Sequence, residues 1–186
     1  MKYVLEHLER RIYKWCFIEY KHISQIVGKE NLIFTNIRND NDRKKLSTYG
    51  VVYSEKVSEL KLKNMCILDP DAKQTLNSKD KFDYLVFGGI LGDYPMKLRT
   101  KELLSSKINC EKRNLGKEQM PTDNAVYAAK HIIGGKRLEE LKFKDKITLK
   151  INENESIDMP FRYVLVNGKP LISDELIEHL KKRRYF

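Results

Sequence analysis

The chain lacks the features that mark membrane and secreted proteins. No apolar run among its 186 residues approaches the ~20 residues that a membrane-spanning helix needs. The opening segment, MKYVLEHLERR, has no apolar core of a signal peptide, because Glu6, His7 and Glu9 interrupt it. We therefore expect a protein that does not associate with membranes and that works in the cytoplasm.

Cysteine is scarce, and its placement argues against a metal site. The three cysteines form no CxxC pair, and Cys16 and Cys66 lie in apolar stretches, whereas Cys110 does not. The histidines also lack the spacing of metal ligands, and they stand at His7, His22, His131 and His179. We interpret the cysteines as reduced structural thiols and the histidines as solvated or packed side chains. We expect no metal.

Familiar catalytic and nucleotide-binding patterns are absent as well. The sequence contains no GxGxxG loop, no phosphate-binding P-loop and no serine, histidine and aspartate arrangement of a hydrolase. No internal repeat, linker or low-complexity segment divides the chain. Since 22.0 kDa is enough for one good core but too little for two, we expect a single domain over residues 1–186.

Positive charge is what the composition does have. Lysine and arginine total 36 against 26 acidic residues, which gives a net charge of +10, and hydrophobic residues make up 41%. This balance is typical of a globular protein with a charged surface. A basic surface favours RNA, a ribosome or another acidic partner. A lysine-rich proteome would produce the same charge without any such partner.

One stretch, FDYLVFGGILGD at residues 82–93, is central to the predicted fold. Its residues 84–87 are apolar without a break, which predicts a parallel strand covered on both faces. Gly88, Gly89 and Gly92 follow that strand. Glycine lets a ligand approach the backbone closely, and ligands of open α/β sheets bind at the carboxyl ends of strands. The stretch is therefore either a ligand-binding loop or an ordinary turn.

Further strands and helices are expected on both sides of this stretch. Apolar runs predict strands at residues 2–5, 31–36, 51–53, 64–69, 108–114, 146–151 and 161–166. Helical spacing predicts helices at 11–27, 100–106, 124–133 and 174–184, a short helix within 39–50 and a helical turn at 55–60. Thr122 or Asp123 is expected to cap the helix at 124–133, and Ser173 the last one. Asn167 and Gly168 predict a tight turn.

Loops of glycine, proline or small polar residues follow three predicted strands. They read CILDP at 66–70, GGILGD at 88–93 and RNLGKEQMPTD at 113–123. In this order, and together with KYVLEHLE, RTKELL and MPFRYVL, they resemble the SPOUT superfamily of methyltransferases. The resemblance extends over residues 1–170. It is closest to the branch with the fungal protein arginine methyltransferase of a small-subunit ribosomal protein, whose relatives were earlier labelled RNA methyltransferases.

This resemblance implies a fold and a cofactor. The fold is α/β, a SPOUT-like parallel sheet flanked by helices with a C-terminal trefoil knot, and the branch is understood to act as a monomer. The cofactor is S-adenosylmethionine. Residues carried over as cofactor-binding are Leu68, Asp69 and Pro70, then Gly88, Gly89, Ile90 and Gly92, then Leu115, Gly116, Gln119, Met120 and Thr122. A β-branched residue at Gly89 is expected to abolish cofactor binding and leave the fold intact.

An arginine substrate would require a carboxylate, because a guanidinium is protonated at pH 7. The carboxylate would orient the guanidinium and accept its proton. The carboxylates considered are Glu6, Glu19, Asp69, Asp93 and Asp123. Asp93 is the leading candidate, since it ends the glycine loop, and a loop-stabilising hydrogen bond is its competing role. Glu19 and Glu6 are the other candidates for such an acidic pocket. Glu19 lies on an apolar helix face, where a structural salt bridge is the competing interpretation. Lys97 and Leu98 depart from the family pattern that precedes Arg99.

Three functions are consistent with the sequence. The first is a protein arginine N-methyltransferase acting on a ribosomal protein. The second is a SPOUT-type RNA methyltransferase of rRNA or tRNA, for which lysine or arginine should stand at the pocket mouth to hold phosphates. The third is a ribosome-associated binding module without catalytic activity. The intact glycine loops argue against the third.

Overall fold

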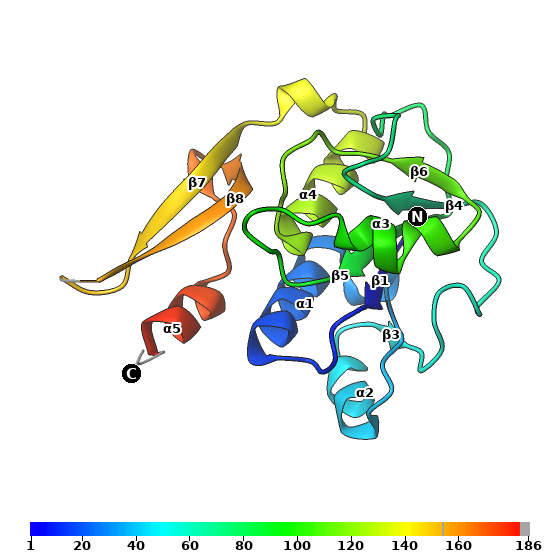
Figure 1. Ribbon diagram of the computed structural model, residues 1–186, viewed down its shortest axis with the longest axis horizontal. Coiled ribbons are helices and arrows are strands. Elements are labelled where there is room, and N and C mark those ends of the chain that lie inside the picture. The colour runs from blue at the N-terminus through cyan, green and yellow to red at the C-terminus, as the bar shows by residue number, and fades with distance from the viewer. Residues whose placement is uncertain (154, 183–186) are drawn as a thin grey trace.

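A parallel sheet forms the centre of the computed structural model, which describes residues 1–153 and 155–182 (Figure 1). Its strand order is β3-β2-β1-β5-β4-β6, and every neighbouring pair runs parallel. The strands are β1 (Lys2–His7), β2 (Leu32–Thr35), β3 (Val51–Val52), β4 (Met65–Leu68), β5 (Tyr84–Gly89) and β6 (Glu111–Arg113). The predicted α/β class is confirmed, and β5 lies between β1 and β4 as an interior strand.

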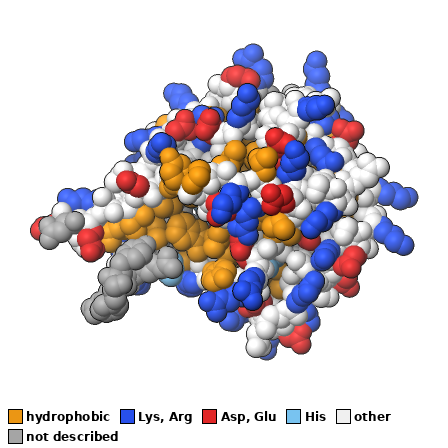
Figure 2. Space-filling model, viewed as in Figure 1, with side chains coloured by type: hydrophobic (Ala, Val, Ile, Leu, Met, Phe, Trp, Pro, Cys, Tyr) orange, Lys and Arg blue, Asp and Glu red, His pale blue; other side chains and the backbone are white. Residues whose placement is uncertain are grey.

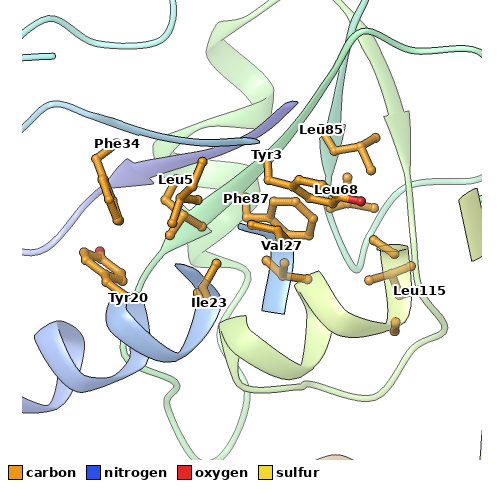
Figure 3. Packing of buried hydrophobic residues seen from close by; sticks show 14 of the residues in the cluster. Tyr3, Leu5, Tyr20, Ile23, Val27, Phe34, Leu68, Leu85, Phe87 and Leu115 are labelled. Atoms are coloured by element: carbon orange, nitrogen blue, oxygen red, sulfur yellow. The ribbon is translucent and has the colours of Figure 1, made fainter. Parts of the chain in front are cut away.

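Both faces of this sheet are covered, as the apolar run of β5 predicted. Alternate residues of β5 point to opposite faces, because side chains alternate along a strand. Leu85 and Phe87 belong to the larger core, with residues of α1 (Lys14–Val27) and α4 (Thr122–Ile133) (Figure 3). Val86 belongs to a second core on the other face, near α3 (Arg99–Leu103). The carboxyl ends of the strands therefore form the accessible edge.

The smaller elements agree with the sequence only in part, because the 3-10 helices at 29–31 and 138–140 were not predicted. The short helix predicted within residues 39–50 is α2 (Asp40–Leu46). Three 3-10 helices are also present in the described chain: η1 (Lys29–Asn31), η2 (Ser105–Lys107) and η3 (Leu138–Glu140). The helix predicted at 100–106 is divided between α3 and η2. Among the described residues, no helix is long and apolar enough to cross a membrane.

A second sheet is antiparallel and extends from the body of the molecule (Figure 1). It contains β7 (Phe143–Lys150), β8 (Ser156–Val166) and β9 (Lys169–Pro170), and α5 (Asp174–Lys182) follows it. The predicted turn is confirmed, with positive φ at both Asn167 and Gly168. Ser173 caps α5 as predicted, accepting the Leu176 N–H at 3.2 Å. The predicted end of that helix, at 183–184, lies outside the described residues.

The start of α4 differs from the prediction. The helix begins at Thr122, its N-cap is Pro121, and no side chain of the cap residue bonds to the first turn. The Thr122 N–H instead donates to Oε1 of Glu19 at 2.8 Å, across 103 residues of sequence. The first turn of a helix has free N–H groups and attracts negative charge. A carboxylate on α1 therefore takes the place of the local cap.

Candidate functional site

Three loops meet at the carboxyl ends of β5, β4 and β6 and enclose an open pocket of about 860 Å³. We call it the loop pocket. Ten of the twelve residues predicted to bind the cofactor line it: Leu68, Asp69, Pro70, Gly88, Ile90, Leu115, Gly116, Gln119, Met120 and Thr122. Neighbouring parallel strands end at one edge of a sheet, so loops distant in sequence become neighbours. The structure thus brings together three loops that are separated along the sequence.

The other two glycines have different positions. Gly89 is buried within β5, pairs with His7 and lines neither pocket described here. A Cβ at Gly89 would overlap the hydroxyl of Tyr20 on α1. Gly89 ends β5 but is buried there, so the expectation that a β-branched residue would leave the fold intact is wrong. A β-branched residue there would disturb the packing of α1 and could not test cofactor binding alone.

Gly92 lies in the loop after β5, where this loop comes close to the antiparallel sheet. A Cβ at Gly92 would meet the side-chain amide of Gln119 and the ring of Phe161. The loop is also tied to the segment between β1 and α1. Oε1 of Glu9 accepts the Leu91 N–H at 3.0 Å and a guanidinium N–H of Arg99 at 3.0 Å. Sequence reasoning missed this role of Glu9, since nothing local distinguishes it from a surface carboxylate.

The two aspartates of the loop pocket already have partners. Asp69 accepts the hydroxyl of Ser105 and the Asp71 N–H, which fixes the loop after β4. Asp93 lies 3.6 Å from Nη1 of Arg99 and 3.8 Å from Nζ of Lys97. Its side chain is 32% exposed. Asp93 therefore lies in the loop pocket, as predicted, but with two cations beside it.

A second pocket, of about 760 Å³, adjoins the first. We call it the acidic pocket, because Glu19 and Asp123 both line it. Its walls include the aromatic side chains of Trp15, Phe161 and Tyr163. Four residues line both pockets and form the wall between them: Ile90, Leu91, Gln119 and Met120. None of the described residues that line the acidic pocket is a lysine or an arginine.

Glu19 and Asp123 are both buried, although both line the pocket. Burial, and after it the charge of Asp123, raise the pKa of Glu19, while the N–H groups of Thr122 and Asp123 lower it, and together they place it at about 8. No salt bridge of Glu19 is found within the described part of the chain. The carboxylate of Glu19 accepts the Thr122 N–H at the start of α4 instead. The structural salt bridge considered as its competing role is therefore not found in the described residues.

Asp123 is held in place by neighbours on α1 and α4. Its Oδ2 lies 2.7 Å from Nδ1 of His22, and its Oδ1 accepts the backbone and side-chain N–H groups of Asn124. Asn124 in turn accepts the Val164 N–H of β8 at 2.8 Å. No local pattern predicted that His22 would contact a carboxylate 101 residues away. These bonds fix the side of the pocket that faces α4.

Glu6 is distant from this arrangement. It is 2% exposed, lines neither pocket, and its carboxylate accepts the hydroxyl of Thr35 and the Val57 N–H. Burial raises its pKa. These contacts join β1 to β2 and to the segment after β3, so the geometry gives Glu6 a structural position. Of the three carboxylates predicted for catalysis, Asp93 and Glu19 line pockets and Glu6 does not.

An apolar surface lies where the hairpin of β7 and β8 meets the part of the molecule built on the parallel sheet. Figure 2 shows a continuous hydrophobic area there, with lysine and arginine side chains beside it. The described residues include no group of three histidine, cysteine, aspartate or glutamate side chains that could hold a metal ion.

Comparison with known proteins assigns the chain to a family. The model of the family "SFM1-like: Protein arginine N-methyltransferase SFM1-like" matches residues 2–185. The chain belongs to the SFM1-like family. A relative in this family, protein arginine N-methyltransferase SFM1 of Saccharomyces cerevisiae, is 39% identical over 98% of this chain and 95% of its own length. The resemblance carried by the three loops is thereby confirmed.

Solved structures of SFM1-like proteins have the same fold. Yeast arginine methyltransferase SFM1 complexed with SAH matches with a TM-score of 0.87 and 37% identity, over 97% of this chain and 94% of that one. The same protein complexed with SAM also matches with a TM-score of 0.87. A Trm10 structure from Thermococcus kodakaraensis, 21% identical, shares the fold with a TM-score of 0.57, over 75% of this chain and 96% of that one. The parallel sheet with its flanking helices is therefore the SPOUT fold.

Proposed function

We propose that the chain methylates an arginine side chain of a ribosomal protein, with S-adenosylmethionine as the methyl donor. As a member of the SFM1-like family it is an S-adenosylmethionine-dependent methyltransferase. Yeast SFM1 has been solved with SAM, SAH and MTA. The ribosomal protein is the finer part of the proposal. It rests on the resemblance of the loops and on the net charge of +10.

The loop pocket fits the cofactor. Small-molecule sites are concave and mostly apolar, with a few polar groups that orient the ligand, and the loop pocket has such a lining. Its walls combine apolar side chains, such as Leu115 and Met120, with the backbone of Gly88 and Gly116. Gly116 has φ +92°, a conformation that favours glycine. When bound, S-adenosylmethionine supplies a methyl group carried on a positively charged sulfur.

The acidic pocket fits the arginine side chain, and this observation carries the proposal. A guanidinium is planar and cationic, and it binds carboxylates through several N–H donors and packs against aromatic rings. The pocket offers the carboxylates of Glu19 and Asp123 and the rings of Trp15 and Phe161. It shares a wall with the loop pocket. A guanidinium there would be placed next to the cofactor.

Glu19 is the residue we propose as proton acceptor. An arginine nitrogen must lose a proton when it is methylated, because the methylated guanidinium keeps a single positive charge. A carboxylate with a raised pKa is a better base than an ordinary one, since a base is most effective when its pKa is near the working pH. Entry of a cation favours the ionised form of Glu19. Asp123 then orients the guanidinium, while Asp93, with Arg99 and Lys97 beside it, serves the loop.

RNA methylation is the main alternative, and the charge distribution disfavours it. A phosphate-binding mouth needs lysine or arginine, whereas the described lining of the acidic pocket contains carboxylates and no basic residue. The basic surface still suits a ribosomal target, because surface charge steers encounter while the pocket selects the reacting group. A binding module without activity would not require two adjoining pockets of this kind.

The experiment that tests the proposal uses S-adenosylmethionine with a labelled methyl group and small ribosomal subunits. After the reaction, protein is separated from RNA and both are counted. We expect the label in protein, on arginine, in the presence and absence of a metal chelator. Label confined to RNA would replace the proposal with the RNA methyltransferase. Absence of label from both fractions would exclude the ribosomal target.

Three further features of the branch are part of the proposal. We expect the trefoil knot, in which the C-terminal part of the chain threads through an earlier loop. We also expect a monomer in solution and a cytoplasmic location. The monomer can be checked by light scattering, where a dimer mass at all concentrations would contradict it.

A further inference from the structure

One residue of the acidic pocket has a buried hydroxyl without a partner. Tyr163 on β8 is 2% exposed and is among the residues that line this pocket. Its hydroxyl has no hydrogen-bond partner among the described residues, although buried hydroxyls nearly always have one. The carboxylates of Asp123 and Glu19 are near enough for their charges to raise the pKa of the phenol, after burial itself. Neither accepts a hydrogen bond from it.

A buried hydroxyl without a hydrogen-bond partner lowers the stability of the fold, unless a bound ligand supplies the partner. The tyrosine ring itself contributes to a hydrophobic cluster, because it packs with Ile147 of β7 and Met159 of β8. Phenylalanine would provide that packing without the unpaired oxygen. The hydroxyl therefore has no structural task in the chain alone, and its position among the pocket residues indicates a role toward the occupant.

The chemistry of the pocket shows which occupant the hydroxyl would recognise. The ionised carboxylates of Glu19 and Asp123 can only accept hydrogen bonds, and a phenol oxygen accepts them as well. A guanidinium presents five N–H donors in one plane, whereas an ammonium presents three from a single atom. Two carboxylates can satisfy an ammonium. A third acceptor at a different place in the pocket suits the wider guanidinium.

We propose that the Tyr163 hydroxyl accepts a hydrogen bond from the substrate guanidinium and thereby favours arginine over lysine. This inference rests on the proposed function, because it takes the acidic pocket as the arginine site. Tyr163 is then a specificity residue that touches the substrate. It takes no proton in the reaction, which leaves that role to Glu19.

The test is Tyr163→Phe, which removes only the oxygen. Methylation is measured with small-subunit ribosomal proteins as substrate, with propylguanidinium and propylammonium as competing inhibitors. We expect the KM for the protein substrate to rise and the preference for propylguanidinium over propylammonium to fall, each by about tenfold, as for a lost hydrogen bond to a charged group. The affinity for S-adenosylmethionine should not change. The Tm should be equal or higher, since an unpaired buried oxygen is removed.

Tyr20→Phe is the matched control. Its hydroxyl lies 2.8 Å from Nδ1 of His7 between α1 and the sheet, so its removal should lower the Tm and leave the inhibitor preference unchanged. If the wild type methylates protein and Tyr163→Phe keeps the wild-type preference for propylguanidinium over propylammonium, this inference alone is overturned. A Tyr163→Phe variant that loses Tm or cofactor affinity would also overturn it. A wild type that does not methylate protein would overturn the proposed function together with the inference.

Discussion

The two pockets differ in what they are made of. The loop pocket lies at the ends of three neighbouring strands, where glycine residues such as Gly88 and Gly116 expose backbone. The acidic pocket is made of side chains from α1, α4 and β8, represented by Glu19, Asp123 and Tyr163. A backbone site is specified by short contiguous segments, whereas a side-chain site is specified by how distant elements pack.

The pockets also differ in how their acids are neutralised. Asp93 in the loop pocket has Arg99 and Lys97 beside it. In the acidic pocket Glu19 is bonded to a helix start and Asp123 to His22 and Asn124. A bound arginine would supply the cation that the described lining of the acidic pocket lacks. We therefore expect the turnover of the protein substrate to depend on residues of the acidic pocket. The affinity for S-adenosylmethionine should depend on residues of the loop pocket.

The strongest challenge to this division is Glu19→Gln. Glutamine keeps an oxygen that can accept the Thr122 N–H, so the start of α4 is preserved, but it cannot accept a proton or attract a cation as strongly. We expect turnover of the protein substrate to fall by about 10² or more. The affinity for S-adenosylmethionine, measured by calorimetry, should stay within about twofold, because a residue absent from the loop pocket contributes little there.

Glu6→Gln is the matched control for that variant. It replaces a buried carboxylate that lines neither pocket and that accepts bonds from Thr35 and Val57. We expect a lower Tm and normal turnover per folded molecule. Equal losses of turnover in the Glu6 and Glu19 variants would mean that the acidic pocket has no special place in the reaction.

The difference between the pockets also explains what the sequence could predict. The loop segments could be recognised because each is continuous and follows an apolar strand. The acidic pocket could not, because Glu19 and Thr122 are separated by 103 residues and His22 and Asp123 by 101. Glu19 was predicted as a candidate for an acidic pocket, but Asp93 was favoured over it, because no local pattern shows that Glu19 meets the start of α4. The MPFRYVL stretch resembled the family, but no local pattern shows that Phe161 and Tyr163 face α1.

The antiparallel sheet illustrates a second limit of sequence reasoning. The strand predicted at 146–151 begins at 143, and the one predicted at 161–166 begins at 156. A register shift separates Asp145 from Ile147, and Lys146 has φ +55°. Such a bulge breaks the alternation by which strands are recognised. Pro160 falls opposite this irregularity, where a missing N–H costs no ladder bond.

The pH dependence of the reaction offers a finer test of the acidic pocket. Burial raises the pKa of Glu19 to about 8, so at neutral pH much of the free enzyme holds this group protonated. We expect kcat/KM for the protein substrate to rise about tenfold between about pH 7 and about pH 9 as Glu19 ionises, since this parameter reports groups of the free enzyme. A profile that is flat across this range would contradict the assignment.

Stability should change with pH in the opposite direction. The pKa of Glu19 is higher in the folded chain than its ordinary value of 4.5. Between these two values the folded chain binds more protons than the unfolded chain, so this group lowers the free energy of unfolding as the pH rises. Glu19→Gln removes the effect. The variant should therefore gain stability relative to the wild type at pH 8 compared with pH 5, as measured by urea denaturation.

The smallest effect is expected for Asp93→Asn, the carboxylate that the sequence favoured for catalysis. Its substitution removes ion pairs of 3.6 Å to Arg99 and 3.8 Å to Lys97, and such partly exposed pairs are worth little. Glu9 continues to hold both Arg99 and the Leu91 N–H, so the loop should keep its path. We expect turnover to change by less than about threefold and any loss to fall on cofactor affinity. A fall of about 10² in turnover with unchanged cofactor affinity would instead assign the proton transfer to Asp93 and remove the division between the two pockets.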